Sequence, residues 1–196
     1  MDPQRPDPQG IREAAGVLRR GGLVAFPTET VYGLGANLQD PQAIQELYRV
    51  KRRPFEKKVT LHVAQKNAVE SAGVRVTDLA RRLIDRFWPG PLTLILSRAD
   101  GSSIGFRMPD HPVALALIRE AQVPVVAPSA NLSGQPPPRS AESIVRDFSR
   151  EIDLILDAGP TPLGMESTVL DLSGPTPKIL RRGALGDRIE EFLHSP

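Results

Sequence analysis

The stretch LVAFPTETVYGLG, residues 23–35, joins an apolar run to a polar segment that ends at two closely spaced glycines. Its first four residues are typical of a short buried strand, which Pro27 then ends. Thr28, Glu29 and Thr30 follow directly, and a plain turn needs no such set of side chains. In open α/β sheets, ligands bind beyond the strand ends, where the loops converge. The stretch therefore predicts a buried strand whose polar end helps to hold a small ligand.

Polar side chains also stand beside five other apolar runs of the chain. They are His62, Arg107, Ser129 and Asn131 in the segment PSAN, Ser167 with Thr168, and Arg181 with Arg182. Taken singly, most of these segments also fit ordinary turns, and His62 also fits a hydrogen-bonded position in the core. Arg107 is harder to explain in that way, because a guanidinium within a strand needs an anionic partner.

A basic run, KRRPFEKK, occupies residues 51–58, with five basic residues and one acidic residue in eight positions. Alone, such a run also fits the solvated end of a helix. Together with the polar strand ends, it describes a pocket rich in cations and hydroxyl groups. A pocket of that kind suits a polyphosphate and a carboxylate.

The composition narrows the class of protein. The chain has 196 residues, enough for one sizeable core, and its 40% apolar and 24% charged residues are typical of globular proteins. The absence of cysteine excludes a disulfide framework, a cysteine nucleophile and a thiolate metal site. A net charge of +2 with a pI of about 9.2 is weak evidence for a nucleic-acid partner. No apolar run approaches the length of a membrane span, and no signal peptide begins the chain, so we expect a cytoplasmic protein without membrane contact.

The alternation of patterns predicts the fold class. We expect helices at 10–20, 41–50, 78–87, 110–118 and 140–149, and a short one after Asp187. We expect strands at 23–26, 59–63, 92–96, 104–108, 123–127, 153–156, 168–172 and 178–181. This order indicates an α/β protein with a twisted mixed sheet flanked by helices. Residues 1–9 are expected to form a flexible arm, and residues 10–196 a single domain.

Several common enzyme motifs are missing from the sequence. There is no P-loop pattern, and GLGANL lacks the third glycine of the dinucleotide fingerprint. There is no H-E-x-x-H segment, and no serine lies within G-x-S-x-G. The usual hydrolase and metalloenzyme chemistries are therefore not predicted, and we assign no metal ligand.

Six segments, in this order along the chain, resemble the YrdC/Sua5 family. They are PTETVYGLG (27–35), the K-x-R element at Lys51 and Arg53, PGPLT (89–93), FRMPDHP (106–112), PSANLSG (128–134) and STVLDL (167–172). The matching region runs from about residue 10 to residue 193. The resemblance implies a YrdC-like α/β fold with an open central ligand cavity, in the short form with one domain.

Members of that family are L-threonylcarbamoyladenylate synthases, which are nucleotidyltransferases. The resemblance implies that L-threonine, bicarbonate and ATP give threonylcarbamoyl-adenylate and pyrophosphate, with Mg²⁺ held by the phosphates. The product would supply N6-threonylcarbamoyladenosine at position 37 of tRNA, and a separate complex would carry out the transfer. tRNA or another structured RNA is an expected partner on the same ground.

The resemblance also assigns residues to the site. The implied catalytic residues are Lys51, Arg53, Ser129 and Asn131, which are also implied to bind ATP. Three further residues are implied to bind ATP only: Lys57, Ser103 and Arg181. The implied threonine-binding residues are Thr28, Thr30, His62, Arg107 and Ser167. Basic side chains neutralise phosphates, and a guanidinium matches a carboxylate in bidentate geometry. No nucleophilic side chain is needed, because the substrates react with one another once they are positioned.

Some positions depart from the family's pattern. Lys57 replaces a frequent asparagine, Lys58 and Val59 stand where Pro-Leu is usual, and RRG at 181–183 replaces Arg-Pro-Gly. The roles of Lys57, Lys58 and Arg182 therefore stay open. A non-catalytic binder of double-stranded or structured RNA is an alternative, although the aromatic content is only 5% and no stacking platform is evident. A paralogue without activity is another alternative. The K-x-R element and the S-x-N element, which is Ser129 and Asn131, are both intact, and this argues against a loss of activity.

Overall fold

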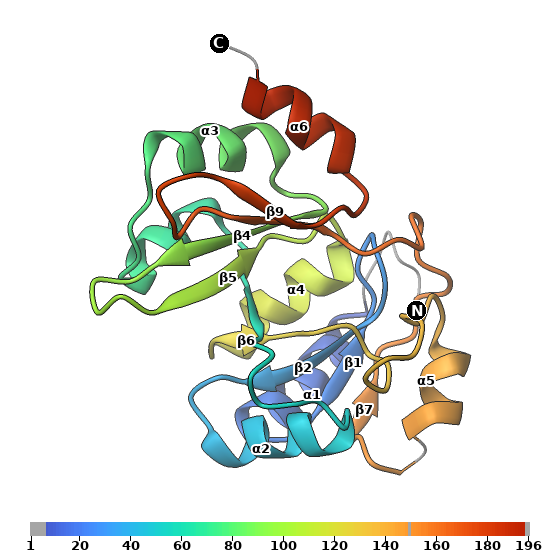
Figure 1. The fold of residues 1–196 in the computed structure, drawn as a ribbon. Coiled ribbons are helices and arrows are strands. Elements are labelled where there is room, and N and C mark those ends of the chain that lie inside the picture. Colours follow the sequence, from blue (N-terminus) through green and yellow to red (C-terminus); the bar gives the residue numbers. More distant parts are fainter. Residues whose placement is uncertain (1–6, 149, 195–196) are drawn as a thin grey trace.

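The computed structural model describes residues 7–148 and 150–194, which form a twisted mixed sheet flanked by helices (Figure 1). The helices are α1 (Pro8–Arg19), α2 (Pro41–Val50), α3 (Asp78–Phe87), α4 (Pro112–Ala121), α5 (Ala141–Phe148), α6 (Gly186–His194) and a 3₁₀ helix at Lys66–Ala72. The strands are β1 (Val24–Phe26), β2 (Gly33–Asn37), β3 (Thr60–His62), β4 (Leu92–Ser97), β5 (Ser103–Arg107), β6 (Val125–Val126), β7 (Leu154–Ile155), β8 (Thr168–Asp171) and β9 (Lys178–Arg181). The predicted fold class is confirmed.

The strand order brings segments that are distant in sequence to one region of the sheet. The order is β7-β1-β2-β6-β3-β5-β4-β8-β9. Strands β3 and β5 are parallel, and their register sets His62 directly beside Arg107. Strands β4 and β8 are also parallel, with Leu92 opposite Thr168. The first pair therefore sets two predicted site residues side by side, and β8 begins directly after a third, Ser167.

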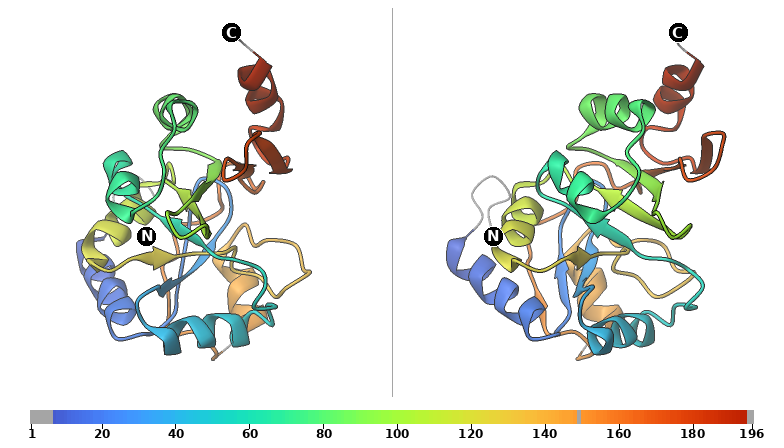
Figure 2. Two further views of the ribbon diagram at one scale, coloured as in Figure 1. Left: turned by 60° about the vertical axis from the view of Figure 1, so that its left-hand side comes forward. Right: turned by 90° about the vertical axis from the view of Figure 1, so that its left-hand side faces the viewer.

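Helices cover the sheet in three groups (Figures 1 and 2). Val24 and Phe26 of β1 pack in a cluster with residues of α1 and α4. Ala25, which points to the opposite face, packs with residues of α2 and α5. The other end of the sheet, β4, β5 and β8, packs against α3 and α6. The alternation along β1 therefore explains how a three-residue strand supports helices on both faces.

Local sequence signals fix several helix starts. The Asp40 carboxylate accepts hydrogen bonds from the backbone N–H groups of Gln42 and Ala43, and the Thr77 hydroxyl accepts one from Ala80, as expected for N-caps. Asp7 caps α1 in the same way. That helix begins at Pro8 and not at residue 10, and the rest of the predicted arm, residues 1–6, lies outside the described residues.

Other elements differ from the expectation. Strand β2 was not predicted, because GLGAN is rich in glycine and has no β-branched residue. A Cβ at Gly35 would lie 3.0 Å from the Phe26 ring, so the glycine allows β2 to pack tightly on β1. In helix α4 the N-cap position is His111 rather than Asp110, and its side chain makes no capping hydrogen bond. Within residues 7–148 and 150–194, no helix has both the length and the apolar character to cross a membrane.

Candidate functional site

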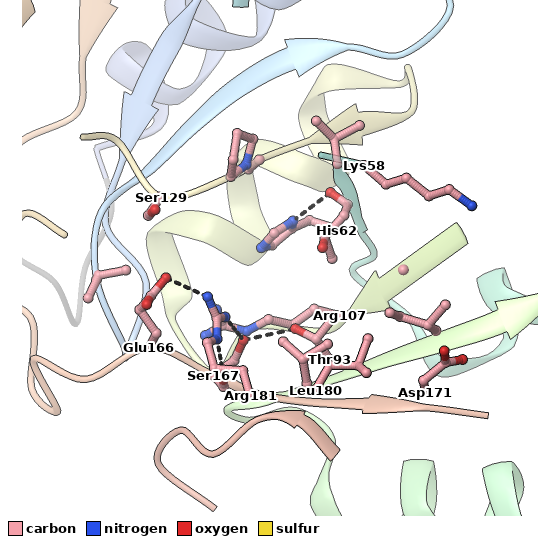
Figure 3. Close-up of a pocket in the computed structure, with 18 of the residues that line it drawn as sticks. Lys58, His62, Thr93, Arg107, Ser129, Glu166, Ser167, Asp171, Leu180 and Arg181 are labelled. Carbon is pink, nitrogen blue, oxygen red and sulfur yellow. Dashed lines mark hydrogen bonds and ion pairs between the residues drawn. The ribbon is translucent and has the colours of Figure 1, made fainter. Parts of the chain in front are cut away.

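A cavity of about 440 Å³ lies where β3, β4, β5, β8 and β9 meet the loop that follows β6 (Figure 3). The expected site residues that line it are Arg53, His62, Ser103, Arg107, Ser129, Ser167 and Arg181. Figure 3 shows Glu166, Ser167 and Arg181 gathered on one side and His62 and Lys58 on the other. The lining therefore combines basic groups with hydroxyl groups from segments far apart in sequence.

Arg181 is held by its neighbours on the cavity wall. Its NH1 lies 2.6 Å from the Glu166 carboxylate, its Nε donates to the Ser167 carbonyl at 3.0 Å, and its NH2 donates to Ser167 Oγ at 3.1 Å. The Ser167 and Thr93 hydroxyls lie 2.9 Å apart. Burial lowers the pKa of Arg181, whereas the nearby Glu166 carboxylate raises it. The guanidinium is thus a fixed cation with an acidic partner, next to a hydroxyl pair.

Arg107 also has an acidic partner. Its NH2 lies 2.8 Å from a carboxylate oxygen of Glu29, and both side chains are more than nine-tenths buried. The same NH2 donates to Thr30 Oγ1 at 2.8 Å. The anionic partner expected for this guanidinium is therefore present within the protein.

His62 lies beside Arg107 on the cavity wall. Its Nδ1 is 3.3 Å from the Thr60 carbonyl oxygen, a distance that suits an Nδ1–H donor and leaves Nε2 as an acceptor. Burial, and next the charge of Arg107, lower the pKa of His62 to about 3. The imidazole is therefore neutral at physiological pH, and it suits hydrogen bonding better than proton uptake.

Lys51 does not line the cavity. Its side chain is buried, and its ammonium donates to the carbonyl oxygens of Ser129 and, at 2.6 Å, of Asn131. Burial, and next the charge of Arg53, lower the pKa of Lys51 to about 7, whereas the two carbonyl contacts favour the ammonium form. Lys51 therefore ties the end of α2 to the loop at 128–134.

The S-x-N element is internally bonded. Ser129 Oγ donates to the Asn131 side-chain carbonyl at 2.6 Å, and the Asn131 amide donates to the Leu132 and Gln135 carbonyl oxygens. Asn131 is buried and absent from the cavity lining, whereas Ser129 reaches it. Of this element, the structure brings only Ser129 to the cavity surface.

The segment from Arg53 to Lys58 forms one rim of the cavity. The Arg53 guanidinium donates to the Lys57 carbonyl at 3.1 Å and to the Lys58 carbonyl at 2.8 Å. The Lys58 ammonium donates to Ser103 Oγ at 3.0 Å and lines the cavity with Arg53. The Lys57 side chain is exposed and is not part of the lining. Of the two lysines, only Lys58 is part of the cavity lining.

Thr28 and Thr30 are buried behind the cavity wall. Their hydroxyl oxygens lie 2.8 Å apart, and Thr28 Oγ1 donates to the Val31 carbonyl at 2.6 Å. Neither residue is part of the cavity lining. The structure thus brings these two threonines close to Arg107 without exposing them in the cavity.

Sequence reasoning missed the acidic and hydroxyl partners of the site. Glu29, Glu166 and Thr93 contact the predicted residues, and Asp171 lines the cavity. Glu29 stood within the opening polar segment, and Glu166 stood next to STVLDL, so position alone could have singled them out. Thr93 and Asp171 stand within the segments PGPLT and STVLDL, but inside apolar strand patterns that did not single them out.

Comparisons with known proteins show which family the chain resembles. The Sua5_yciO_yrdC family model, described as telomere recombination, matches residues 16–183. The threonylcarbamoyl-AMP synthase of Bacillus subtilis strain 168 is 46% identical over 200 residues, which cover 97% of this chain and 58% of the relative. A putative threonylcarbamoyl-AMP synthase of Mycobacterium tuberculosis strain H37Rv is 38% identical, with 98% and 92% of the two chains covered.

A solved structure gives the same result. Sua5 of Pyrococcus abyssi, described as a complex with L-threonine, superposes with a TM-score of 0.91 at 42% identity over 97% of this chain and 59% of that chain. The chain therefore spans slightly less than three-fifths of the Bacillus and Pyrococcus proteins that it matches. Since the family model covers most of the sequence and relatives share up to 46% identity with it, the chain belongs to the Sua5/YciO/YrdC family.

Proposed function

We propose that this protein is an L-threonylcarbamoyladenylate synthase, a nucleotidyltransferase. The amine of L-threonine and bicarbonate would form a carbamate with loss of water. A carbamate oxygen would then attack the α-phosphorus of ATP, forming one P–O bond while the bond to the bridging oxygen breaks and pyrophosphate leaves. The names of the curated relatives and the threonine complex of the Pyrococcus protein support this proposal.

One observation carries the proposal: four basic side chains converge on a single cavity. Arg53 and Lys58 come from one rim segment, Arg107 from β5 and Arg181 from β9, and all four line the same space. Like charges repel, and such a cluster is favourable when anions occupy the space between them. A triphosphate and a carboxylate are anions of the required kind. The site would act by positioning and by charge stabilisation, without a covalent enzyme intermediate.

Two ends of the cavity suit the two substrates. His62, Arg107 and Ser167 would surround threonine, with the guanidinium on the carboxylate and the neutral imidazole as a hydrogen-bond acceptor. Arg53, Lys58 and Arg181 would face the phosphates, with the Ser103 hydroxyl as a neutral donor. Ser129, whose Oγ donates its proton to Asn131, would form part of the wall at this end. Lys51 and Asn131 would act on the phosphate end by holding the loop that carries Ser129.

Mg²⁺ is part of the proposal as a partner of the triphosphate. Within residues 7–148 and 150–194, no group of three or more His, Cys, Asp or Glu side chains could hold a metal ion. Glu166 and Asp171 are acidic residues of the lining that would lie near a phosphate-bound ion. When bound, Mg²⁺ neutralises phosphate charge and keeps several of its own waters, so a cage of protein ligands is not required.

The product would be used for N6-threonylcarbamoyladenosine at position 37 of tRNA, by transfer in a separate complex. We place this reaction in the cytoplasm. The alternative, a non-catalytic binder of structured RNA, is not favoured, because the basic groups of the lining face a cavity that also holds hydroxyl groups and a buried imidazole. Recognition of duplex RNA would instead use exposed contacts to phosphates and 2′-hydroxyl groups.

Pyrophosphate release tests the proposal directly. The purified protein should convert ATP to pyrophosphate only when L-threonine and bicarbonate are both present, and omission of either should stop the reaction. L-Serine should be a poorer substrate, because one methyl group in a pocket is worth about 1–3 kcal/mol. Release that is independent of threonine, or no release under any of these conditions, would contradict the proposed reaction.

Two neighbouring lysines give a matched test of the phosphate end. Lys58→Ala should raise the KM for ATP about tenfold, since one charge-assisted contact to a phosphate is lost. Lys57→Ala should leave it almost unchanged, because that side chain is exposed and is not part of the cavity lining. Steady-state kinetics at fixed, saturating threonine and bicarbonate measure both values. Equal effects of the two substitutions would show that the rim acts only through its general charge.

A further inference from the structure

The wall behind Arg107 contains a set of buried polar contacts that the proposed reaction does not use directly. Arg107 NH2 lies between Glu29 and Thr30, at 2.8 Å from a carboxylate oxygen of the first and 2.8 Å from Oγ1 of the second. One terminal nitrogen of the guanidinium is therefore held on the protein side, while the residue also lines the cavity.

The hydroxyl groups of Thr28 and Thr30 already donate their protons within the protein. Thr28 Oγ1 donates its single proton to the Val31 carbonyl, so Thr30 Oγ1 must be the donor in the 2.8 Å contact between the two threonines. Thr30 Oγ1 then accepts from Arg107 NH2. Both threonines thus fix the position of the arginine, and neither has a proton left to offer to a ligand.

Glu29 differs from the threonines because it carries a charge, which pairs with Arg107 and also acts on the nearby imidazole of His111. Within residues 7–148 and 150–194, no donor reaches either carboxylate oxygen with hydrogen-bond geometry, although both oxygens are buried. Its backbone carbonyl is fixed by the Leu163 N–H at 2.9 Å, so the residue is held in place. A buried carboxylate costs free energy unless it is paired, and the contact with Arg107 is the ion pair that Glu29 makes.

We propose that Glu29 is a positioning residue for the amino-acid substrate. It anchors one edge of the Arg107 guanidinium, so that the remainder of the group keeps the orientation needed to bind a carboxylate. The proposal rests on the proposed function, since it takes threonine as the ligand of Arg107. Without this anchor, the guanidinium can turn towards the acidic residues Glu166 and Asp171, which line the same cavity.

Glu29→Gln tests the proposal, because it keeps the size of the side chain and removes its charge. We expect calorimetry to show threonine binding weakened by at least about tenfold, since a misplaced guanidinium loses one or more charge-assisted hydrogen bonds to the carboxylate. ATP binding should change less than twofold. Glu70→Gln, which breaks the exposed ion pair with Arg81, is the matched control and should change neither affinity.

An analogue without a carboxylate separates positioning from direct contact. L-Threoninol keeps the amine, the hydroxyl and the methyl group of threonine. Its inhibition constant against threonine-dependent pyrophosphate release should be the same in the wild type and in Glu29→Gln. Weaker inhibition of the variant would mean that Glu29 contacts the substrate itself, and would overturn the proposal.

Thermal unfolding supplies a readout that is independent of substrate. Glu29→Gln should lower the Tm of the wild type, because it leaves Arg107 buried without a counter-ion, and should raise the Tm of Arg107→Met, where the carboxylate is the unpaired charge. A change in Tm of the same sign in both backgrounds would show that Glu29 and Arg107 do not stabilise one another, and would overturn the proposal. Threonine binding that is unchanged in Glu29→Gln would overturn this proposal alone, whereas a wild-type protein that binds no threonine would overturn the proposed function as well.

Discussion

Lys51→Met is expected to lower the rate of pyrophosphate release by at least about a hundredfold while the protein stays folded. Methionine has a similar length but donates no hydrogen bond, so the Asn131 carbonyl loses the ammonium donor and the Ser129 carbonyl keeps only the Asn131 N–H. A buried carbonyl without a partner costs about 1–3 kcal/mol. Removal of a buried charge offsets part of that cost, and we expect a modest decrease in the free energy of unfolding.

The loss of activity should come from movement of the loop at 128–134. Ser133 N–H also bonds to the Lys51 carbonyl at 2.9 Å, so side chain and backbone of Lys51 hold the same loop. If Lys51 acts through this loop, Lys51→Met should add little to the loss already caused by Asn131→Ala. Lys66→Met, at a partly exposed lysine that pairs with Asp85, is the control. Fully additive losses would instead indicate that Lys51 contacts the nucleotide itself.

Much of the fold could be predicted because its signals are local. The Asp40-Pro41 start and the Thr77 cap depend on hydrogen bonds within one turn of helix, and both lie where the sequence places them. Strand β2 was missed for the opposite reason. Its GLGAN sequence carries no strand signal, and it is a strand because β1 and β6 pair with it on either side.

The candidate site could be predicted in part only. Motifs name the residues that a ligand would need, and seven of them line one cavity. They do not show which residues pair with one another, because such contacts join distant positions: Thr30 and Arg107 are 77 residues apart, and Lys51 and Ser129 are 78 apart. The inward-facing Lys51 and the Glu29 partner of Arg107 follow from tertiary packing.

Arg107→Lys is expected to weaken threonine binding by about a hundredfold, with ATP binding nearly unchanged. Lysine keeps the positive charge but has one compact ammonium group in place of the planar fork of donors. It cannot contact Glu29 and Thr30 on one side and also present paired donors to a carboxylate on the other. The charge that contributes to the low pKa of His62 is retained, so titration of the imidazole does not explain the loss.

Calorimetry with each ligand separately measures this effect. Arg81→Lys, in the exposed pair with Glu70, is the matched control and should bind both ligands as the wild type does. A surface that binds RNA uses exposed and mutually replaceable charges, so an arginine-to-lysine change should cost little beyond a small change in salt dependence. If Arg107→Lys bound threonine normally but duplex RNA more weakly, Arg107 would belong to an RNA-binding surface. A selective loss of threonine binding is expected because the guanidinium is buried, is held at one terminal nitrogen by Glu29 and Thr30, and belongs to a residue that lines the cavity.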